Sequence, residues 1–119
     1  MANQIVWCDI PVKDLDRAIE FYSAVLGKAV SKETVGEITF GLLPDAHSGV
    51  SGCLVTDDSQ PSANGPMIYM NCESRLDAAI DVVEKSRGKV LKPKHQIGPH
   101  GYRAVVLDSE GNRIALHST

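Results

Sequence analysis

The chain has 119 residues, of which 43% are hydrophobic and 23% are charged, proportions that are ordinary for one globular domain. Its formal net charge of −3 and its pI near 5.7 give no basic face for nucleic acid or anionic lipid, so we expect neither as a partner. No apolar run approaches the roughly 20 residues of a membrane helix. The start Met-Ala-Asn-Gln lacks the features of a signal peptide, so we expect a cytoplasmic protein.

The first part of the chain has the pattern of a strand, a helix and two further strand segments. Asp14 is a suitable N-cap for the helix, whose apolar residues fall on one face, and Gly27 supplies the left-handed residue that ends it. Gly36 lies inside the next strand segment and indicates a bend or a hairpin there. In chain order, the expected strand, helix, strand and strand cover residues 5–12, 15–26, 35–43 and 52–56.

Residues 57–66 contain Ser, Pro, Asn and Gly without any periodicity, which is typical of a linker. The second part of the chain then repeats the first, and we expect the order strand, helix and three strands in both parts. We expect its helix to begin at Ser74 or Arg75 and to end at Gly88. The strands are expected at residues 67–72, 89–91, 102–107 and 112–117, with a loop at 92–100 and a hairpin turn at 109–111.

An internal repeat supports this division into two units. Residues 15–30 and 76–91 are identical at six of sixteen aligned positions, and a short apolar run precedes each copy. Such a repeat indicates two copies of one structural unit, with a cleft where the copies face each other. We therefore expect a single domain over 1–119, with a first module at about 1–57, a linker at about 57–66 and a second module at about 67–119.

Three segments carry motifs of one known superfamily. They are Val-Lys-Asp-Leu-Asp-Arg-Ala at 12–18, with Phe21-Tyr22 after it; Ala-Ala-Ile at 78–80, with Gly-Lys-Val at 88–90; and Asp-Ser-Glu-Gly-Asn-Arg-Ile at 108–114. Together they resemble the vicinal oxygen chelate superfamily, which includes glyoxalase I, extradiol dioxygenases, fosfomycin-resistance enzymes and bleomycin-binding proteins. The resemblance implies an α+β fold in which two βαβββ modules form a curled, open barrel of mixed β-sheet with the helices outside.

The same resemblance implies four inward-facing His, Glu or Gln ligands for a divalent metal, two from each module. Carried over one at a time, these positions are Trp7, Met67 (or Ile68), a residue of the strand 52–55, and Ala115. None of them provides the nitrogen or oxygen donor that such a metal requires. We therefore expect no metal cofactor at the usual place, while a divalent metal held elsewhere stays an alternative.

Neighbouring residues of these strands are expected to line the cleft, because alternate residues of a strand share a face. His100 is added because its loop can cover the cleft. The expected ligand-binding residues are Trp7, Asp9, Met67, Tyr69, Asn71, His100, Tyr102 and His117. Aromatic walls with a few polar groups are typical of small-molecule pockets. The alternative for Trp7 is a place in the core.

His117 is the expected catalytic residue, as a general base or a relocated metal ligand, with Asp9 as its orienting partner. The alternatives are a partly solvated imidazole at the end of the last strand and an ion pair between Asp9 and a nearby Lys or Arg. His100 has the alternative of a surface position. His47 and His95 are expected in loops, exposed to solvent.

The sequence leaves three functions open. The first is a protein that binds a small molecule between the modules without metal, as bleomycin-binding members of the resembled superfamily do. The second is a metal-dependent lyase or dioxygenase whose ligands have moved to His117, Asp9 and, as an optional third, His100. The third is an interaction module with a vestigial cleft. We expect a homodimer, by resemblance and because exposed strand edges and incomplete barrels favour association.

Overall fold

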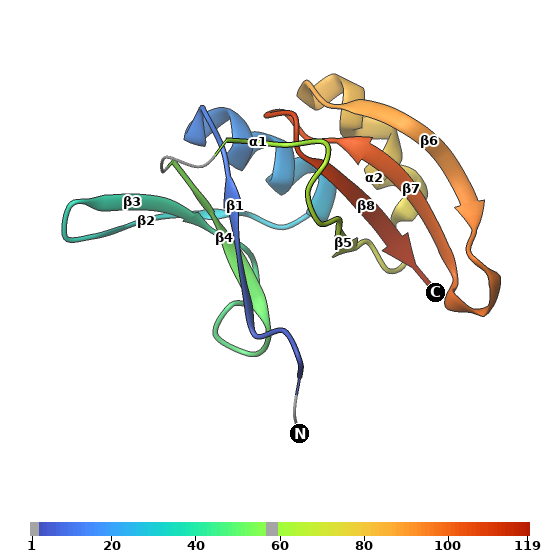
Figure 1. Cartoon of the computed structure of the whole chain (residues 1–119), viewed down its shortest axis with the longest axis horizontal. Helices are drawn as coiled ribbons and strands as arrows, with labels where there is room; N and C mark the ends of the chain where they lie inside the picture. The colour runs from blue at the N-terminus through green and yellow to red at the C-terminus, as the bar shows by residue number, and fades with distance from the viewer. Residues whose placement is uncertain (1–2, 57–59) are drawn as a thin grey trace.

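The expected order of elements, a strand, a helix and three strands in each half, is confirmed in the computed structural model, which describes residues 3–56 and 60–119 (Figure 1). The first module consists of β1 (Trp7–Pro11), α1 (Leu15–Leu26), β2 (Ser31–Val35), β3 (Ile38–Leu42) and β4 (Ser51–Val55). The second consists of β5 (Ile68–Asn71), α2 (Leu76–Val83), β6 (Lys89–Gln96), β7 (Tyr102–Leu107) and β8 (Arg113–Ser118), with 3₁₀ turns η1 (Glu84–Ser86) and η2 (Gly98–His100). The expected boundary at 57 and the start of the expected linker lie outside the described residues.

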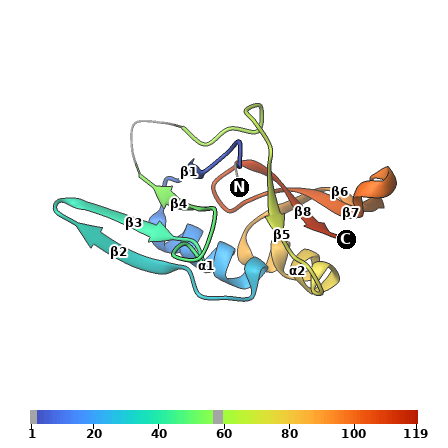
Figure 2. The same ribbon diagram turned by 90° about the horizontal axis from the view of Figure 1, so that it is seen from below.

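Each module forms its own four-stranded mixed sheet. Sheet A has the strand order β1-β4-β3-β2 and sheet B the order β5-β8-β7-β6, so that the first strand of each module lies parallel to its last. The helices α1 and α2 pack against each other, and each contacts the sheet of its own module (Figure 1 and Figure 2). This arrangement confirms the α+β fold with two βαβββ modules. The face of each sheet that carries no helix is called its open face below.

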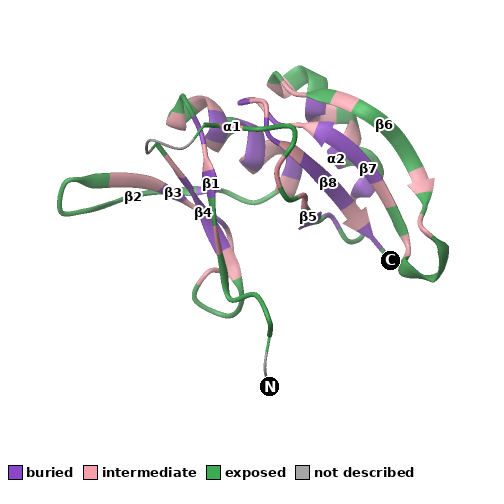
Figure 3. Cartoon of the chain, viewed as in Figure 1, coloured by how far each residue is buried: buried purple, intermediate pink, exposed green. Residues whose placement is uncertain are grey.

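The hydrophobic core lies between the helices and the sheets (Figure 3). Its largest fully buried side chains are Tyr22, Phe21, Leu54, Ile114, Leu116, Val25, Val83, Val106 and Cys72. Burying an apolar side chain of this size stabilises the fold by about 1.5–3 kcal/mol relative to leaving it exposed. By contrast, β2 is exposed along its whole length and β6 along most of its length. These two outer strands therefore contribute little to the core, unlike β1 and β5, which place Ile10 and Met70 in it.

Helix α1 begins and ends where the sequence predicts. Asp14 has an extended backbone, and its carboxylate accepts the N–H of Arg17 at 3.1 Å, which caps the first turn. Gly27 has φ +70°, the left-handed conformation that ends the helix. The turn between β7 and β8 adds a second cap, because Glu110 Oε1 accepts the N–H groups of Lys13 and Asp14 at 2.9 Å each. The N-terminus of α1 therefore joins the two modules.

The end of α2 differs from the prediction. The sequence predicts Gly88 as the residue that ends the helix, but Arg87 takes the left-handed conformation, with φ +74°. The N–H of Gly88 bonds to the Val83 carbonyl at 2.8 Å. The N–H of Arg87 bonds to the Glu84 carbonyl at 3.3 Å, which completes a Schellman motif. Gly88 is required for close packing instead, because a Cβ there would lie 2.5 Å from the Leu107 carbonyl oxygen.

Strand β6 is longer than predicted. The sequence predicts a strand at 89–91 and a loop at 92–100, but β6 continues well into that loop. Pro93 does not end the strand, because β6 is the outer strand of sheet B and needs no N–H on its outer side. Its pairing with β7 shifts register on both sides of Lys92, as bulges do. His95 consequently lies in a strand and is half-buried, so the expected solvent-exposed loop position is wrong.

The hairpin expected around Gly36 is present, with Gly36 at φ +62° between β2 and β3. Its first strand begins at Ser31, before the predicted segment 35–43, because Ser31–Val35 is mostly polar and shows no buried side to recognise. The other strand ends, β6 apart, lie within two residues of the predicted ones. Among the described residues, no helix has the length and apolar character needed to cross a membrane.

Candidate functional site

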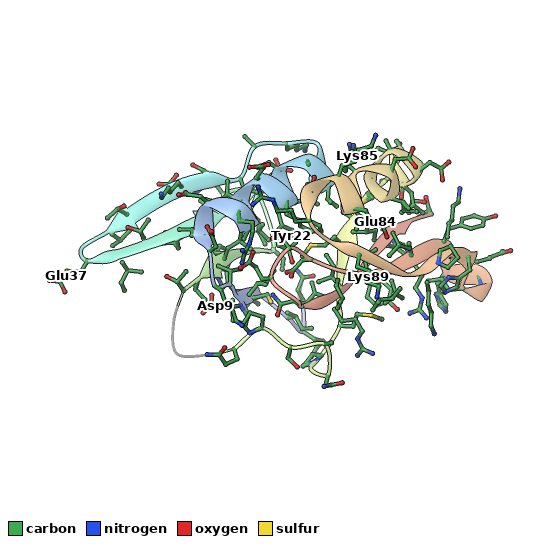
Figure 4. The ribbon with its side chains drawn as sticks, turned by 90° about the horizontal axis from the view of Figure 1, so that it is seen from above. Asp9, Tyr22, Glu37, Glu84, Lys85 and Lys89 are labelled. Carbon is green, nitrogen blue, oxygen red and sulfur yellow. The ribbon has the colours of Figure 1, made fainter. Side chains whose placement is uncertain are left out.

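The open face of sheet A carries Trp7 and Asp9 of β1 (Asp9 is labelled in Figure 4), because Cys8 and Ile10 contact the core on the other side. Asp9 pairs with Cys53 of β4, and its Oδ1 accepts a hydrogen bond from the Cys53 thiol at 3.3 Å. Burial, and then this hydrogen bond, raise the pKa of Cys53 to about 11. The thiol is therefore neutral at pH 7 and weakly reactive.

The open face of sheet B carries a row of four polar side chains that crosses all four strands. The strand register pairs Asn71 of β5 with His117 of β8. It also pairs His117 with Arg103 of β7, and Arg103 with His95 of β6. Paired residues of neighbouring strands point to the same face, and the alternating residues Met70, Ala104 and Leu116 are buried on the other side. We call these four residues the polar row; Tyr69, two residues before Asn71, shares their face.

Arg103 is held within the polar row by two hydrogen bonds. Its Nε donates to His95 Nε2 at 3.0 Å, and its Nη1 donates to the Tyr69 hydroxyl. The guanidinium carbon lies 5.8 Å from the centroid of the Tyr69 ring. His95 Nδ1 lies 2.9 Å from the Pro93 carbonyl oxygen and must donate to it, because a carbonyl can only accept. Two uncharged groups therefore orient the Arg103 guanidinium.

His117 is oriented by the backbone of η2. Its Nε2 lies 2.7 Å from the His100 carbonyl oxygen and therefore carries a hydrogen that it donates. The Tyr69 ring meets the imidazole edge-on, with the ring centroids 6.0 Å apart. Among the described residues, Nδ1 of His117 has no hydrogen-bond partner. Its lone pair is free to accept a hydrogen bond or a proton from a bound molecule.

These side chains form a pocket of about 520 Å³, whose lining residues are Tyr69, Ile97, His100, Arg103 and His117. The lining combines a permanent cation, an imidazole with a free nitrogen, and aromatic and aliphatic surface. Small-molecule pockets in proteins typically measure about 300–1,000 Å³ and have this mixture of apolar walls and a few polar groups. We call this space the sheet B pocket.

A second pocket, of about 410 Å³, lies between β1 and β5, where the two modules meet. Trp7, Tyr69 and Asn71 line it together with apolar residues such as Ile5 and Ile68. Trp7 is 42% exposed and therefore does not belong to the core. Tyr69 lines both pockets, so the two spaces are neighbours on the surface.

The structure brings some of the predicted site residues together and separates others. Tyr69, His117 and His100 meet in the sheet B pocket, where His100 also supplies its carbonyl oxygen. The expected pairing of Asp9 with His117 is not formed, because Asp9 bonds to Cys53 and His117 to the backbone of η2. Asp9 belongs to sheet A and His117 to sheet B.

Met67 and Tyr102 line neither the sheet B pocket nor the pocket between β1 and β5. Met67 precedes the first residue of β5. Tyr102 lies on the helix side of sheet B, the side of buried Ala104, and the Lys94 ammonium lies 5.4 Å from the centroid of its ring. Strand alternation explains this position, because Tyr102 and Arg103 are adjacent and must face opposite sides.

The sequence interpretation missed Arg103, His95 and Ile97. A usable indication was present for Arg103: in a hairpin closed by the turn at 109–111, it lies opposite His117. His95 was missed because the sequence predicts a loop at 92–100, whereas His95 lies in β6. Ile97 follows β6 and reaches the pocket because its N–H bonds to the Gly101 carbonyl at 2.8 Å, which closes the η2 turn over the sheet.

The residues present do not fit the superfamily's usual metal site. Trp7, Met67 or Ile68, and Ala115 offer no side-chain nitrogen or oxygen with a lone pair for a metal, and residues 52–55 offer only the neutral thiol of Cys53. Nor does the described part of the chain contain a group of three or more His, Cys, Asp and Glu side chains arranged to hold a metal ion. The usual metal positions therefore provide no ligand set through which a metal-dependent step could run.

Comparison with known proteins identifies relatives that match nearly the whole chain. The family model described as the Glyoxalase/Bleomycin resistance protein/Dioxygenase superfamily matches residues 4–116. A glyoxylase-like domain-containing protein from Didymella fabae is 31% identical over 125 residues, which cover 96% of this chain and 92% of that protein. The match therefore extends over both modules.

Solved structures share the fold at lower sequence identity. A glyoxalase/bleomycin resistance protein from Albidiferax ferrireducens T118 superimposes with a TM-score of 0.76 at 20% identity, covering 98% of this chain and 99% of that chain. The fosfomycin resistance protein FosX from Listeria monocytogenes superimposes with a TM-score of 0.70 at 17% identity, covering 100% and 95%. Because the family model matches nearly the whole chain, the protein belongs to the Glyoxalase/Bleomycin resistance protein/Dioxygenase superfamily.

Proposed function

We propose that the protein binds a small organic molecule in the sheet B pocket without the usual metal of its superfamily. The observation that carries this proposal is the lining of the pocket, in which Arg103, His117 and Tyr69 converge from three different strands. Each of these side chains is oriented by a hydrogen bond or a ring contact, which reduces the entropy lost when a ligand binds. The residues at the superfamily's usual metal positions lack suitable ligand atoms, which supports binding without a metal.

The alternative, a metal-dependent lyase or dioxygenase, requires a relocated metal at His117 and Asp9, with His100 as an optional third ligand. The geometry favours binding without metal, because Asp9 and His117 are engaged with separate partners on separate sheets. Elemental analysis of untagged protein, grown with Ni, Zn, Mn and Fe present, separates the two functions. Metal far below one equivalent supports the proposal, whereas about one tightly held equivalent would overturn it and favour the relocated site.

Ligand binding is tested by nuclear magnetic resonance with a mixed set of neutral and charged small molecules. We expect ligands to shift backbone resonances near Tyr69 and His117, and Tyr69→Ala to abolish those shifts. Tyr102→Ala is a matched control, because Tyr102 is exposed to a similar degree (39% against 46% for Tyr69) but lies on the other side of sheet B. If no compound shifts these resonances, or if both variants behave like the wild type, the proposed function is wrong and an interaction module becomes the better interpretation.

We further propose a homodimer in which the open face of sheet A in one copy covers the open face of sheet B in the other. The faces are complementary in charge outside the sheet B pocket: Asp9 and Glu33 lie on the face of sheet A, and Arg113 lies on that of sheet B. Val35 and Ile38 add an apolar pair at the end of the β2–β3 hairpin, 67% and 66% exposed.

Analytical ultracentrifugation tests the dimer. We expect the wild type to sediment as a dimer and Ile38→Asp to shift it toward monomer, because a charge would be placed in the contact. Glu37→Gln, at the tip of the same hairpin (Figure 4), should leave the dimer intact. A wild-type protein that stays monomeric at every concentration tested would exclude this association.

A further inference from the structure

We propose that the ligand of the sheet B pocket carries a carboxylate, and that Arg103 binds this group. The inference rests on the proposed function and names the chemical class of its ligand. Arg103 is the residue of this pocket whose charge is permanent, because guanidinium groups stay protonated in proteins.

The charge of Arg103 is not balanced by an acidic side chain. The ion pairs among the described residues join Arg17 to Glu110 and three exposed lysines to aspartates, and none includes Arg103. Both of its hydrogen-bond partners, His95 and Tyr69, accept through neutral atoms. A half-buried cation without a counter-charge gains more from an anion than an exposed one does, because less water screens the pair.

The guanidinium also keeps donors available for a ligand. Arginine has five N–H groups, and Arg103 uses one to His95 and one to Tyr69. The remaining N–H groups have no acceptor among the described residues and belong to a side chain that lines the pocket. The Tyr69 hydroxyl accepts from Arg103, so its own hydrogen is free to donate to the same ligand. A carboxylate offers two oxygens that can take both kinds of donor.

A monoanion with an organic body fits the pocket better than a phosphate dianion. The lining supplies one permanent positive charge, and the His117 Nε2–H is already donated to the His100 carbonyl. The turn beside the pocket contains Gly98 and Gly101, but its 3₁₀ segment η2 has three residues and is too short to act as a helix N-terminus. Tyr69 and Ile97 give aromatic and aliphatic surface for the rest of the molecule.

His95 acts as a positioning residue for Arg103. Its Nδ1–H is donated to the Pro93 carbonyl at 2.9 Å, which presents the Nε2 lone pair to the Arg103 Nε–H. This contact fixes the guanidinium plane before a ligand arrives. We expect His95→Phe to weaken carboxylate binding less than the loss of Arg103 does, while neutral ligands keep their affinity.

Titrations with benzoate and its neutral isostere benzamide test the inference. We expect wild-type protein to bind benzoate at least about tenfold more tightly than benzamide, and Arg103→Gln to remove that preference. Lys85→Gln is the control: it removes the same charge from exposed η1, on the helix side of the molecule (Figure 4), and should bind benzoate like the wild type. Arg103→Lys keeps the positive charge but not the planar pair of N–H donors, so we expect it to bind benzoate with intermediate affinity. This variant replaces Arg103→Gln if Arg103→Gln does not fold.

Equal affinity for benzoate and benzamide, or full benzoate affinity in Arg103→Gln, would overturn the inference. Tighter binding of phenyl phosphate than of benzoate would also overturn it, in favour of a phosphoryl ligand. The proposed function fails separately: neutral compounds that shift the Tyr69 and His117 resonances while benzoate does not bind leave the pocket established and exclude the carboxylate. If neither class binds, both proposals are excluded.

Discussion

The hydroxyl of Tyr22 on α1 donates to Asp108 Oδ2 at 2.5 Å, which connects the helix of the first module to the last turn of the second. Both residues are buried, Tyr22 completely. Asp108 Oδ1 also accepts the backbone N–H groups of Glu110 and Asn112, at 2.8 and 2.9 Å. The carboxylate therefore fixes the hairpin turn and holds it against α1 at the same time.

Removal of this hydroxyl should destabilise the protein. Tyr22→Phe deletes the donor and leaves Asp108 with one hydrogen bond fewer in a buried site, so we expect a loss of about 1.5–3 kcal/mol in the free energy of unfolding. Urea denaturation at pH 7 measures the loss. Tyr102→Phe is the control, because Tyr102 is exposed and should change stability by less than about 0.5 kcal/mol. Equal effects of the two substitutions would contradict the prediction.

Stability should fall in acid because of Glu110. Burial raises the pKa of this carboxyl, but the hydrogen bonds from Arg17, Asp14, Ser109 and Lys13 outweigh burial and lower the pKa from 4.5 to about 2. The folded state thus favours the charged form. This contribution is complete above pH 4.5 and is lost as the pH falls toward 2, roughly 3 kcal/mol in total by linkage.

Comparison of the wild type with Glu110→Gln at different pH values checks this. We expect a large difference in the free energy of unfolding at pH 7 and a much smaller one near pH 2.5, because protonation of Glu110 in the unfolded state has removed most of the contribution by then. Glu37→Gln, at the exposed hairpin tip, should show no difference at either pH. A gap between wild type and Glu110→Gln that does not change with pH would mean that the carboxylate charge is not responsible.

Gly88 should not tolerate a side chain. In Gly88→Ala the new Cβ would lie 2.5 Å from the Leu107 carbonyl oxygen and 2.6 Å from the Phe21 ring, so the helix end must move away from sheet B. We expect a loss of about 1–3 kcal/mol, measured by thermal or urea unfolding. Gly49→Ala, where no atom lies within 4 Å of the added Cβ, should be close to neutral. Similar losses for both would contradict the packing argument.

Cys53 should react slowly with iodoacetamide at pH 8, because its pKa of about 11 leaves little thiolate. Burial is the main cause, and the hydrogen bond to Asp9 is the next. Asp9→Asn removes the nearby charge, so we expect alkylation of Cys53 to become several-fold faster, measured by mass spectrometry of its peptide. Asp81→Asn, on the exposed side of α2, should leave the rate unchanged. An unchanged rate in Asp9→Asn would show that burial alone controls the thiol.

The module organisation could be predicted because it depends on local patterns. The repeat in the chain, the Asp14 cap and the left-handed Gly27 are each visible within a few residues. Gly88 matched Gly27 in the repeat, but its role differs because the neighbouring sheet, and not the helix, limits the space around it. Packing of that kind is set by residues far away in the chain.

The candidate site was harder to predict because it depends on register. Arg103 enters the sheet B pocket through its pairing with His117 and His95, and the second pairing requires β6 to continue past Pro93. A proline among lysines has the local pattern of a loop, and only its place on an outer strand permits it. Similarly, Asp9 shares its face with Trp7 as predicted, but the expected partner lies on the other sheet.

The cap that Glu110 places on α1 has a consequence for synthesis. The side chain that accepts the N–H groups of Lys13 and Asp14 follows them by 97 and 96 positions in the chain. During translation, the first module emerges from the ribosome long before this carboxylate exists. Until then, helix α1 has only the cap from Asp14. The domain can therefore complete its folding only after the turn between β7 and β8 has been synthesised.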